Sequence, residues 1–306
     1  MGYNLRPMKD VNGSTISVKP ETGKQRINLI MAGGGVRLGA YVGALEAFRK
    51  MNVEVVGIAG ASGGSIVGSY LAAGWDIEKL YRLVMDTDFS RFKDLSLRAM
   101  MFENGVCSGN RFDTWMDCNI AGLKFKDLDR DLFVTATDLI GQEPVIFSRH
   151  ATPDFLISRA VRYSISFPGM WSAHRWEGKV LVDGNLIPWI PKIIDVMQTR
   201  NEAERTVTLR LMTERAPRGA PKQHLWPWEF FTLLLGTMGA AMENQRVPAW
   251  LWPDTILIKT GNIHPLQFSL TTADKEWLVQ CGYDQVTRYF NKKAPVSCAP
   301  GAGEIA

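Results

Sequence analysis

Short apolar runs alternate with glycine-rich turns and helical patterns over the first quarter of the chain. Residues 28–31 and 53–59 are almost wholly apolar, which is typical of parallel strands that are covered on both faces. Residues 38–50 place apolar side chains at helical spacing, and a second helical pattern runs through Leu71. The order strand, turn, helix, which occurs twice, predicts an α/β domain with a parallel sheet.

The pattern continues less regularly toward the end of the chain. Residues 76–119 are mostly helical by spacing, and an amphipathic helix is expected at 274–291. Short apolar runs predict five further strands, at 132–136, 145–147, 179–182, 206–212 and 255–259.

We divide the chain into four parts on this basis. A polar N-terminal arm covers 1–26, and the α/β core covers 27–192. The strands and helices of 193–292 complete the same domain, and the tail at 293–306 is expected to be disordered.

The composition narrows the class of protein. Hydrophobic residues make up 46% and charged residues 22% of the chain, which are ordinary globular values. A net charge of +4 suits an anionic membrane surface, but it does not indicate a nucleic-acid polymer as partner. The cysteines form no C-x-x-C pair and have no adjacent histidine, so neither a metal site nor a disulfide framework is expected, and a reducing cytosol is favoured.

The sequence carries no recognisable targeting segment. The N-terminus lacks the apolar stretch of a secretory signal, and Arg6 stands where a myristoylation signal has serine or threonine. The longest apolar run, at 230–242, is too short to span a bilayer. These features predict a soluble, cytoplasmic protein.

The strongest chemical signal is Gly-Ala-Ser-Gly-Gly at 60–64. A serine at the tip of a tight strand-to-helix turn holds its hydroxyl in a strained, exposed position, and small neighbours avoid clashes there. The apolar strand before the motif and the helical pattern after it supply this context. Ser62 is therefore the candidate nucleophile, and a glycine-rich turn with a capping serine is the alternative.

A second glycine-rich turn, Gly-Gly-Gly-Val-Arg, occupies residues 33–37. Consecutive glycines let backbone N–H groups turn toward a bound anion. A dinucleotide-binding loop is the rival interpretation, but Leu38 replaces the third glycine of G-x-G-x-x-G, and no acidic residue closes the next strand. We favour an oxyanion loop.

The third signal is Asp183, which follows the apolar run 179–182 and precedes Gly184. An aspartate at the end of a buried strand faces a cleft at the carboxyl edge of the sheet. Asp-Gly is also common in plain turns, so this motif gains its meaning from the other two.

Together, the three motifs resemble the signature of the patatin-like phospholipases: a glycine-rich loop ending in Lys or Arg, then G-x-S-x-G, then Asp-Gly. The resemblance covers about residues 28–191 and includes 137–139 and 166–169. It implies a three-layer α/β fold with a mostly parallel central sheet flanked by helices. It also implies a serine acyl-ester hydrolase of phospholipase A or lysophospholipase type that acts on membrane phospholipids at the inner membrane surface, with no metal or other cofactor.

The resemblance assigns a role to each motif. Ser62 would be the nucleophile and Asp183 its base, in a dyad without histidine. The oxyanion hole is assigned to Gly33, Gly34, Gly35, Arg37 and Gly63. Arg37 has three interpretations: it orients the loop, it meets the lipid phosphate, or it forms a surface salt bridge.

Two residues depart from the family pattern. Leu38 follows Arg37 where the family has glycine, so the resemblance does not give the geometry of the turn. Asn185 replaces the small residue that follows Asp-Gly in the family, which is a milder change.

The histidines test the dyad hypothesis, because a hydrolase triad needs one. His224 and His264 follow Asp183, so the order Ser, Asp, His of ordinary α/β-hydrolases is formally open. Their surroundings favour surface or packed histidines, and His150 and His174 lie outside the motifs.

Several apolar stretches outside the motifs have two interpretations each. Residues 89–102 form either an interfacial helix or lid, or a helix that packs on its own core. The tryptophans of 226–228 and 250–252 either anchor at lipid headgroups or fill an oligomer interface. The run 230–242 is apolar on all sides, which indicates burial against protein or lipid.

The last third of the chain carries no catalytic motif. In its layout the chain resembles bacterial patatin-like enzymes that a cyclic nucleotide activates in anti-phage defence. A cyclic-nucleotide activator and a homo-oligomer are therefore further expectations. The competing functional hypothesis is a catalytically weak lipid- or nucleotide-binding module on the same fold.

Overall fold

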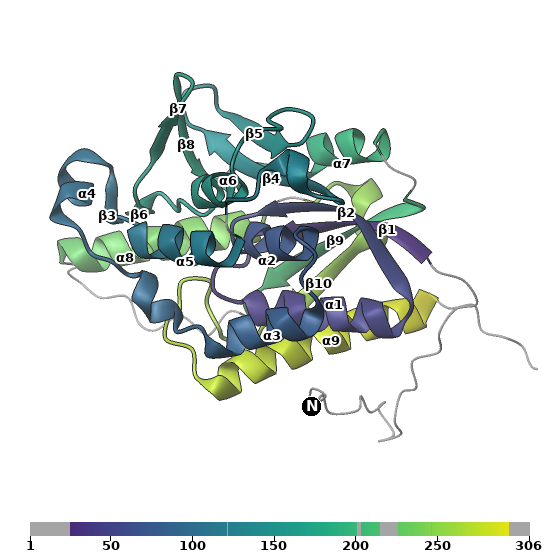
Figure 1. Ribbon diagram of the computed structural model, residues 1–306. Helices are drawn as coiled ribbons and strands as arrows, with labels where there is room; N and C mark the ends of the chain where they lie inside the picture. The colour runs from purple at the N-terminus through teal and green to yellow at the C-terminus, as the bar shows by residue number, and fades with distance from the viewer. Residues whose placement is uncertain (1–24, 121, 201–202, 215–225, 246, 294–306) are drawn as a thin grey trace, which may run out of the picture.

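A twisted sheet forms the centre of the molecule. The computed structural model describes residues 25–120, 122–200, 203–214, 226–245 and 247–293 (Figure 1). The strand order is β10–β9–β1–β2–β4–β8–β7, and β5 also pairs with β4. The bounds are β1 (Gln25–Ala32), β2 (Val53–Ala61), β4 (Asp131–Asp138), β5 (Glu143–Ser148), β7 (His174–Trp176), β8 (Lys179–Asp183), β9 (Arg205–Met212) and β10 (Thr255–Lys259).

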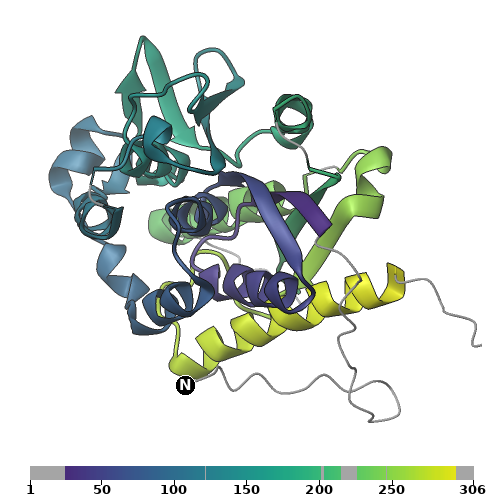
Figure 2. The ribbon, with the colours of Figure 1, turned by 45° about the vertical axis from the view of Figure 1, so that its right-hand side comes forward.

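The sheet is mostly parallel and is covered by helices on both faces. Strands β10, β9, β1, β2 and β4 run parallel, whereas β5 and β8 run antiparallel to β4. Figures 1 and 2 show α1 and α9 below the sheet and α7 above it. The predicted three-layer α/β fold is confirmed. The bounds of these helices are α1 (Leu38–Lys50), α7 (Ile190–Gln198) and α9 (Thr272–Lys293), and a further helix is α2 (Gly63–Ala72).

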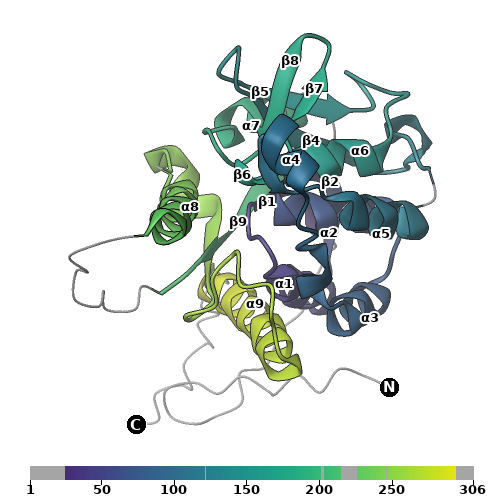
Figure 3. The same ribbon diagram turned by 90° about the vertical axis from the view of Figure 1, so that its left-hand side faces the viewer.

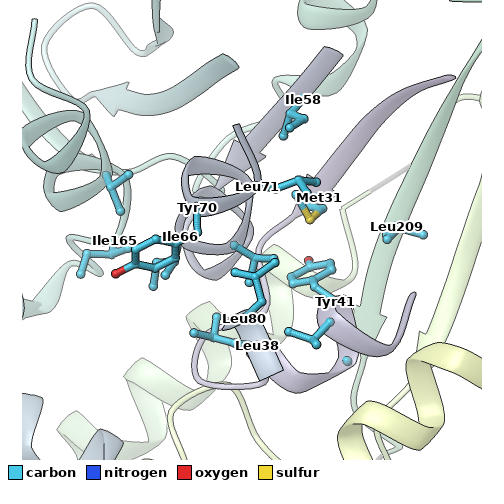
Figure 4. Packing of buried hydrophobic residues seen from close by; sticks show 14 of the residues in the cluster. Met31, Leu38, Tyr41, Ile58, Ile66, Tyr70, Leu71, Leu80, Ile165 and Leu209 are labelled. Atoms are coloured by element: carbon cyan, nitrogen blue, oxygen red, sulfur yellow. The ribbon is translucent and has the colours of Figure 1, made fainter. Parts of the chain in front are cut away.

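The central strands are mostly apolar because each face of the sheet has its own core. In β1, Leu29 and Met31 join the larger core on the side of α1, while Ile30 joins the smaller core on the side of α7. Side chains of a strand point alternately to the two faces, so a strand that is covered on both faces is apolar at most positions. Figure 4 shows Met31 with Tyr41 and other members of the larger core.

Helices α1 and α9 approach each other closely through glycines. A Cβ atom on Gly43 would overlap the carbonyl oxygen of Val279, and one on Gly282 would overlap that of Ala40. Glycine inside a helix costs roughly 1 kcal/mol relative to alanine, so these positions serve the contact between the helices. This contact fixes the C-terminal helix on the helix that follows the first glycine-rich loop.

The region at 76–119, which was expected to be mostly helical, is more varied than that. It contains three α-helices, but also a short strand, β3, that pairs with β6 in a separate two-stranded sheet. The spacing missed β3 because it has only three residues. The elements of this region are α3 (Ile77–Asp86), the 3-10 helix η1 (Phe89–Phe92), α4 (Leu97–Phe102), β3 (Gly105–Cys107) and α5 (Asn110–Ile120). Two later elements are α6 (Ile157–Ser164) and β6 (Gly169–Trp171).

The C-terminal strands extend the same sheet, since β9 pairs with β1 and β10 pairs with β9. Strand β1 begins at Gln25, within the range that we assigned to the arm. The rest of the arm and residues 294–306 of the tail lie outside the described residues.

Helix α8 (Pro227–Glu243) contains the all-round apolar run at 230–242. This pattern indicated burial against protein or lipid, and within α8 only Leu235, Gly239 and Met242 are buried against the protein. Among the described residues, no helix has the length and hydropathy to cross a membrane. The exposed apolar surface of α8 therefore requires another explanation, to which we return below.

Candidate active site

Ser62 lies in the tight turn between β2 and α2. Its backbone has φ 51° and ψ −130°, a strained conformation for a residue with a side chain. The glycines around it are required by space, because a Cβ atom on Gly64 would overlap the carbonyl oxygen of Met31. The turn thus holds the hydroxyl at the N-terminus of α2, where the helix dipole favours developing negative charge.

Asp183 is brought to Ser62 by the antiparallel pairing of β8. Strand β2 ends at Ala61 opposite Thr135 of β4, and Asp183 pairs with the next residue, Ala136. The Ser62 hydroxyl donates a hydrogen bond of 2.7 Å to Oδ2 of Asp183. Asp183 is the last residue of β8, and the contact arises because this antiparallel strand pairs with β4 just beyond the point where β2 stops.

The surroundings of Asp183 raise the pKa of its carboxyl group. The side chain is almost fully buried, and this burial raises its pKa to about 7, although hydrogen bonds from Ser62 and from the backbone N–H of Asn185 oppose the shift. A carboxylate with a pKa near neutrality can take a proton from a hydroxyl and return it within one reaction cycle. The second departure from the family pattern, Asn185, leaves this hydrogen bond in place because it is made by the backbone.

The glycine loop after β1 faces the same point. Gly33, Gly34 and Gly35 have φ values of 71°, 117° and 56°, a run that only glycine adopts without strain. The N–H of Gly33 donates to Ala61 O, whereas within the described residues the N–H groups of Gly34, Gly35 and Gly63 donate to no protein acceptor. All three glycines line the cavity beside Ser62, as an oxyanion hole requires.

The loop is held from behind through its carbonyl groups. The Tyr41 hydroxyl donates to Gly33 O at 2.9 Å, and Nε of Arg37 donates to Gly34 O at 3.0 Å. Burial raises the pKa of Tyr41, so its hydroxyl stays protonated and can donate. With these carbonyls fixed toward the interior, the N–H groups of the next residues are held toward the cavity.

Arg37 is fully buried, which overturns two of its three sequence-based interpretations. It forms an ion pair of 2.6 Å with Glu243 at the end of α8, and it donates to the hydroxyls of Thr213 and Thr260. Burial lowers the pKa of Arg37, and the charge of Glu243 opposes this shift. Arg37 therefore forms no surface salt bridge and does not reach a lipid phosphate; it orients the loop.

Leu38 fits the turn without disturbing it. It is the first residue of α1, is 2% exposed and lines the cavity. The following glycine, Gly39, lies against Lys275 and Leu278 of α9. The first departure from the family pattern is thus accommodated by turning an apolar side chain into the cavity wall.

Two serines that the sequence analysis did not single out connect the site to α6. The Ser62 N–H donates to Oγ of Ser164 at 2.9 Å, and the Asp183 N–H donates to the carbonyl of Ser166 at 2.9 Å. Ser166 is held by the buried Arg162 at 2.7 Å. The only signal in the sequence was the Ser-Phe-Pro-Gly motif at 166–169, whose role could not be assigned without the pairing of these loops.

A cavity of about 740 Å³ opens beside Ser62 and Asp183. Its wall is aromatic and aliphatic, with the charged and polar groups confined to the inner end. Such a wall suits a long apolar chain, while the inner end offers donors for one polar group. The aromatic members of the wall are Phe89, Phe92, Phe112, Trp115, Phe167, Trp171 and Phe268.

The three described histidines lie away from the dyad. His150 stacks on Phe133, and His174 lies against Tyr163, where burial lowers its pKa to about 3. His264 is exposed, and neither it nor the other two line the cavity. His224 lies outside the described residues. In the same described part of the chain, no three His, Cys, Asp or Glu side chains are arranged to hold a metal ion.

Comparison with known proteins agrees with this geometry. A family model of patatin-like phospholipases matches residues 29–191. The chain belongs to the patatin-like phospholipase family. Membership of this family supports lipid hydrolase activity.

The individual relatives extend over different shares of the chain. An uncharacterized protein of Acanthamoeba polyphaga mimivirus is 25% identical over 87% of this chain and 94% of its own length. An uncharacterized NTE family protein of Mycobacterium tuberculosis is 28% identical over 54% of this chain, and the match spans only 44% of that relative.

Solved structures support the fold. VipD from Legionella pneumophila has a TM-score of 0.62 at 16% identity, and the match covers 94% of this chain and 70% of VipD. ExoU from the type III secretion system of Pseudomonas aeruginosa has a TM-score of 0.51 at 15% identity, with 88% and 53% covered.

Proposed function

We propose that this protein is a phospholipase of A or lysophospholipase type, which cleaves acyl esters of membrane glycerophospholipids through a dyad of Ser62 and Asp183. The observation that carries the proposal is the hydrogen bond of 2.7 Å between the strained serine and a buried carboxylate, at the inner end of an apolar cavity. Serine and base lie within the distance that nucleophilic catalysis requires.

In the first half of the reaction, Asp183 takes the proton of the Ser62 hydroxyl while Oγ attacks the ester carbonyl carbon. The carbonyl oxygen becomes an oxyanion, which the N–H groups of Gly34, Gly35 and Gly63 bind. Each such donor typically lowers the barrier by roughly 3 kcal/mol. The protonated Asp183 then gives its proton to the leaving lysophospholipid or glycerol oxygen, and the acyl group stays on Ser62.

In the second half, water replaces the alcohol. Asp183, again a carboxylate, takes a proton from the water, whose oxygen attacks the acyl carbon. The tetrahedral intermediate collapses, Ser62 leaves as the protonated hydroxyl, and the fatty acid is released. One carboxylate thus serves both halves, for which a pKa of about 7 is suited.

The cavity wall supports a fatty acyl chain as the substrate group. Aromatic side chains surround the space, and Arg37, the cation closest to the loop, is used internally by Glu243. The cavity thus presents apolar surface to the chain and N–H donors to the carbonyl. Activation by a cyclic nucleotide remains a prediction from the sequence.

The test combines labelling with hydrolysis. Wild-type protein is incubated with a fluorophosphonate probe and, separately, with phosphatidylcholine and lysophosphatidylcholine vesicles, and fatty acid release is measured with and without cyclic nucleotides. We expect Ser62 to be labelled and fatty acid to be released, and Ser62→Ala to lose both at an unchanged melting temperature. An unlabelled wild type that still binds lipid would support the competing binding-module hypothesis.

A further inference from the structure

Two helices expose apolar side chains of a kind that proteins normally bury. In α4, Leu97, Met101 and Phe102 are 70% to 78% exposed. In the first half of α8, Trp228 and Phe230 are 62% and 59% exposed. Large contiguous apolar patches on a protein surface mark sites of interaction.

The two helices lie at one end of the molecule (Figures 1 and 3). Figures 1 and 3 show α4 and the beginning of α8 at the same end, with β3 and β6 next to them. Phe231 of α8 packs on Gly169 of β6, and Trp171 of the same strand lines the cavity. Strand β3, which pairs with β6, follows α4 directly. The exposed apolar surface is therefore continuous with the apolar wall around Ser62.

Positive charge accompanies this surface. Arg91, Lys93 and Arg111 are exposed, and no carboxylate of the described residues lies within 4 Å of their charged groups. Trp226 and Trp228 stack at 5.1 Å with their rings exposed. Tryptophan with exposed cations that have no carboxylate partner in the described part of the chain, at the edge of an apolar surface, matches the boundary between acyl chains and phosphate headgroups.

We propose that α4 and the first half of α8 form one docking face for a phospholipid bilayer. The aromatic and aliphatic side chains enter the region below the headgroups, and the three cations meet lipid phosphates. A lipid can then pass from the bilayer into the cavity without crossing water. The inference rests on the proposed lipid substrate, and it names the surface that presents this substrate to the site.

The test uses full-length Ser62→Ala, so that binding is measured without hydrolysis. Flotation with vesicles of phosphatidylcholine and phosphatidylglycerol gives the bound fraction. We expect the paired substitution Trp228→Ser with Phe230→Ser to weaken vesicle binding about tenfold or more, and Met101→Ser with Phe102→Ser to do the same, because each pair removes two large apolar side chains that the docked protein would bury in the bilayer. Circular dichroism checks that the variants fold.

A matched control comes from the other end of the molecule. Trp250, in the 3-10 helix η3 (Ala249–Asp254, light green in Figure 1), is 58% exposed, much like Trp228. Trp250→Ser should leave vesicle binding unchanged. In the wild-type background, the docking variants should hydrolyse a short-chain, water-soluble ester at the normal rate but release less fatty acid from vesicles.

Three results would overturn the proposal. These are a parent protein that binds no vesicle of either lipid, docking variants that bind like the parent, and a dimer in gel filtration that the docking variants disrupt, since a second copy would then be the occupant. Failure of the proposed function is a separate result: the chain would dock normally, but wild-type protein would hydrolyse neither the soluble ester nor the lipid.

Discussion

Two regions of the molecule are built in opposite ways. One is the inner end of the cavity, at Ser62 and Asp183, and the other is the surface of α4 and the first half of α8, which we call the mouth. At the inner end, buried polar side chains hold the backbone: Tyr41 and Arg37 fix two loop carbonyls, and Ser164 takes the N–H of Ser62. At the mouth, α4 and α8 leave large apolar side chains exposed. A reaction that develops charge needs donors in fixed positions, whereas a surface that receives a bilayer needs apolar area rather than precise geometry.

One residue connects the two regions. Glu243 is the last residue of α8, whose first half is exposed, yet its carboxylate pairs with the buried Arg37 behind the oxyanion loop. Just beyond it, the Gln245 side chain donates to Asn185 O at 2.6 Å, beside Asp183. The mouth helix is thus joined to both halves of the inner site, and variants can show how far the two regions act independently.

The largest effect is expected for Asp183→Asn, which keeps the shape of the inner end but removes its base. We expect a loss of about 10⁴-fold or more in kcat/KM, because in the described site no other group can take the proton of Ser62. For wild type, the rate should rise with pH up to about 7, because burial raises the pKa of Asp183 and only the carboxylate accepts a proton.

The same pH profile separates a dyad from a triad. It is measured for wild type and for His→Ala variants at 150, 174, 224 and 264. The acidic limb should stay in place in all four. A limb that moves in any of them would show that a histidine is the base and that the dyad is wrong.

Glu243→Gln should have the next largest effect, because it leaves the Arg37 charge buried without its partner. Breaking a buried ion pair on one side typically costs about 3–5 kcal/mol. We expect a lower free energy of unfolding and a fall in kcat with little change in KM, since the oxyanion donors act in the transition state. Denaturant unfolding and steady-state kinetics measure the two effects.

Glu214→Gln is the matched control for this variant. Glu214 pairs with Lys259 at 3.7 Å, but both side chains are more than half exposed, and exposed ion pairs contribute little. If Glu214→Gln and Glu243→Gln changed kcat equally, the link between α8 and the loop would be unsupported.

The sequence predicted the inner end far better than the mouth. The turns at 33–37 and 60–64 have local signatures, because only glycine allows their backbone angles and close contacts. The strand that carries Asp183 was predicted, but its direction was not, since pairing between distant strands leaves no local pattern. Glu243 also gave no signal, because its partner, Arg37, lies 206 residues earlier and meets it only in the fold.

The sequence left two interpretations open at the mouth for a different reason. Apolar periodicity indicates that side chains avoid water, but it does not say whether protein or lipid covers them. Residues 89–102 illustrate this, because Phe89 and Phe92 are buried at the cavity while Met101 and Phe102 are exposed. A single apolar stretch in the sequence thus serves both regions of the molecule.

A third prediction concerns the free energy of unfolding, which the buried carboxylate of Asp183 lowers. Burial raises the pKa of Asp183 from 3.8 to about 7, so the folded state holds this proton more tightly than the unfolded state. The resulting contribution to stability is complete below about pH 4 and is lost as the pH rises through 7. Asp183→Asn should therefore gain stability relative to wild type as the pH rises from 4 to 8, by on the order of 4 kcal/mol.

Chemical unfolding at pH 4 and pH 8 checks this, with Asp138→Asn as the control. Asp138 is also nearly buried, but its pKa is lowered: burial raises it, and hydrogen bonds from the backbone N–H groups of Ile140, Val180 and Gly141 outweigh that effect. The contribution of Asp138 is present above about pH 4 and is lost only as the pH falls below that value, so the control should show almost no change relative to wild type between pH 4 and pH 8. Parallel trends in the two variants would contradict the assignment of a raised pKa to Asp183.

The smallest effect is expected for Tyr41→Phe, which removes one hydroxyl behind the oxyanion loop. The bond from Tyr41 to Gly33 O is one of several that hold the loop, and Gly33 O also accepts from the N–H of Gly64. A single hydrogen bond of this kind contributes about 1 kcal/mol, so we expect kcat to fall severalfold while KM and the acidic limb of the pH profile stay unchanged.

Tyr70→Phe is the matched control for this loss, because it removes a buried tyrosine hydroxyl whose partner is the sulfur of Met116, away from the loop. It should lower stability slightly and leave kcat at the wild-type value. If both variants lowered kcat alike, the loss would reflect general loosening of the core. A loss confined to Tyr41→Phe would instead show that a hydrogen bond behind the loop, one that touches neither substrate nor nucleophile, holds the N–H groups in the positions that the transition state needs.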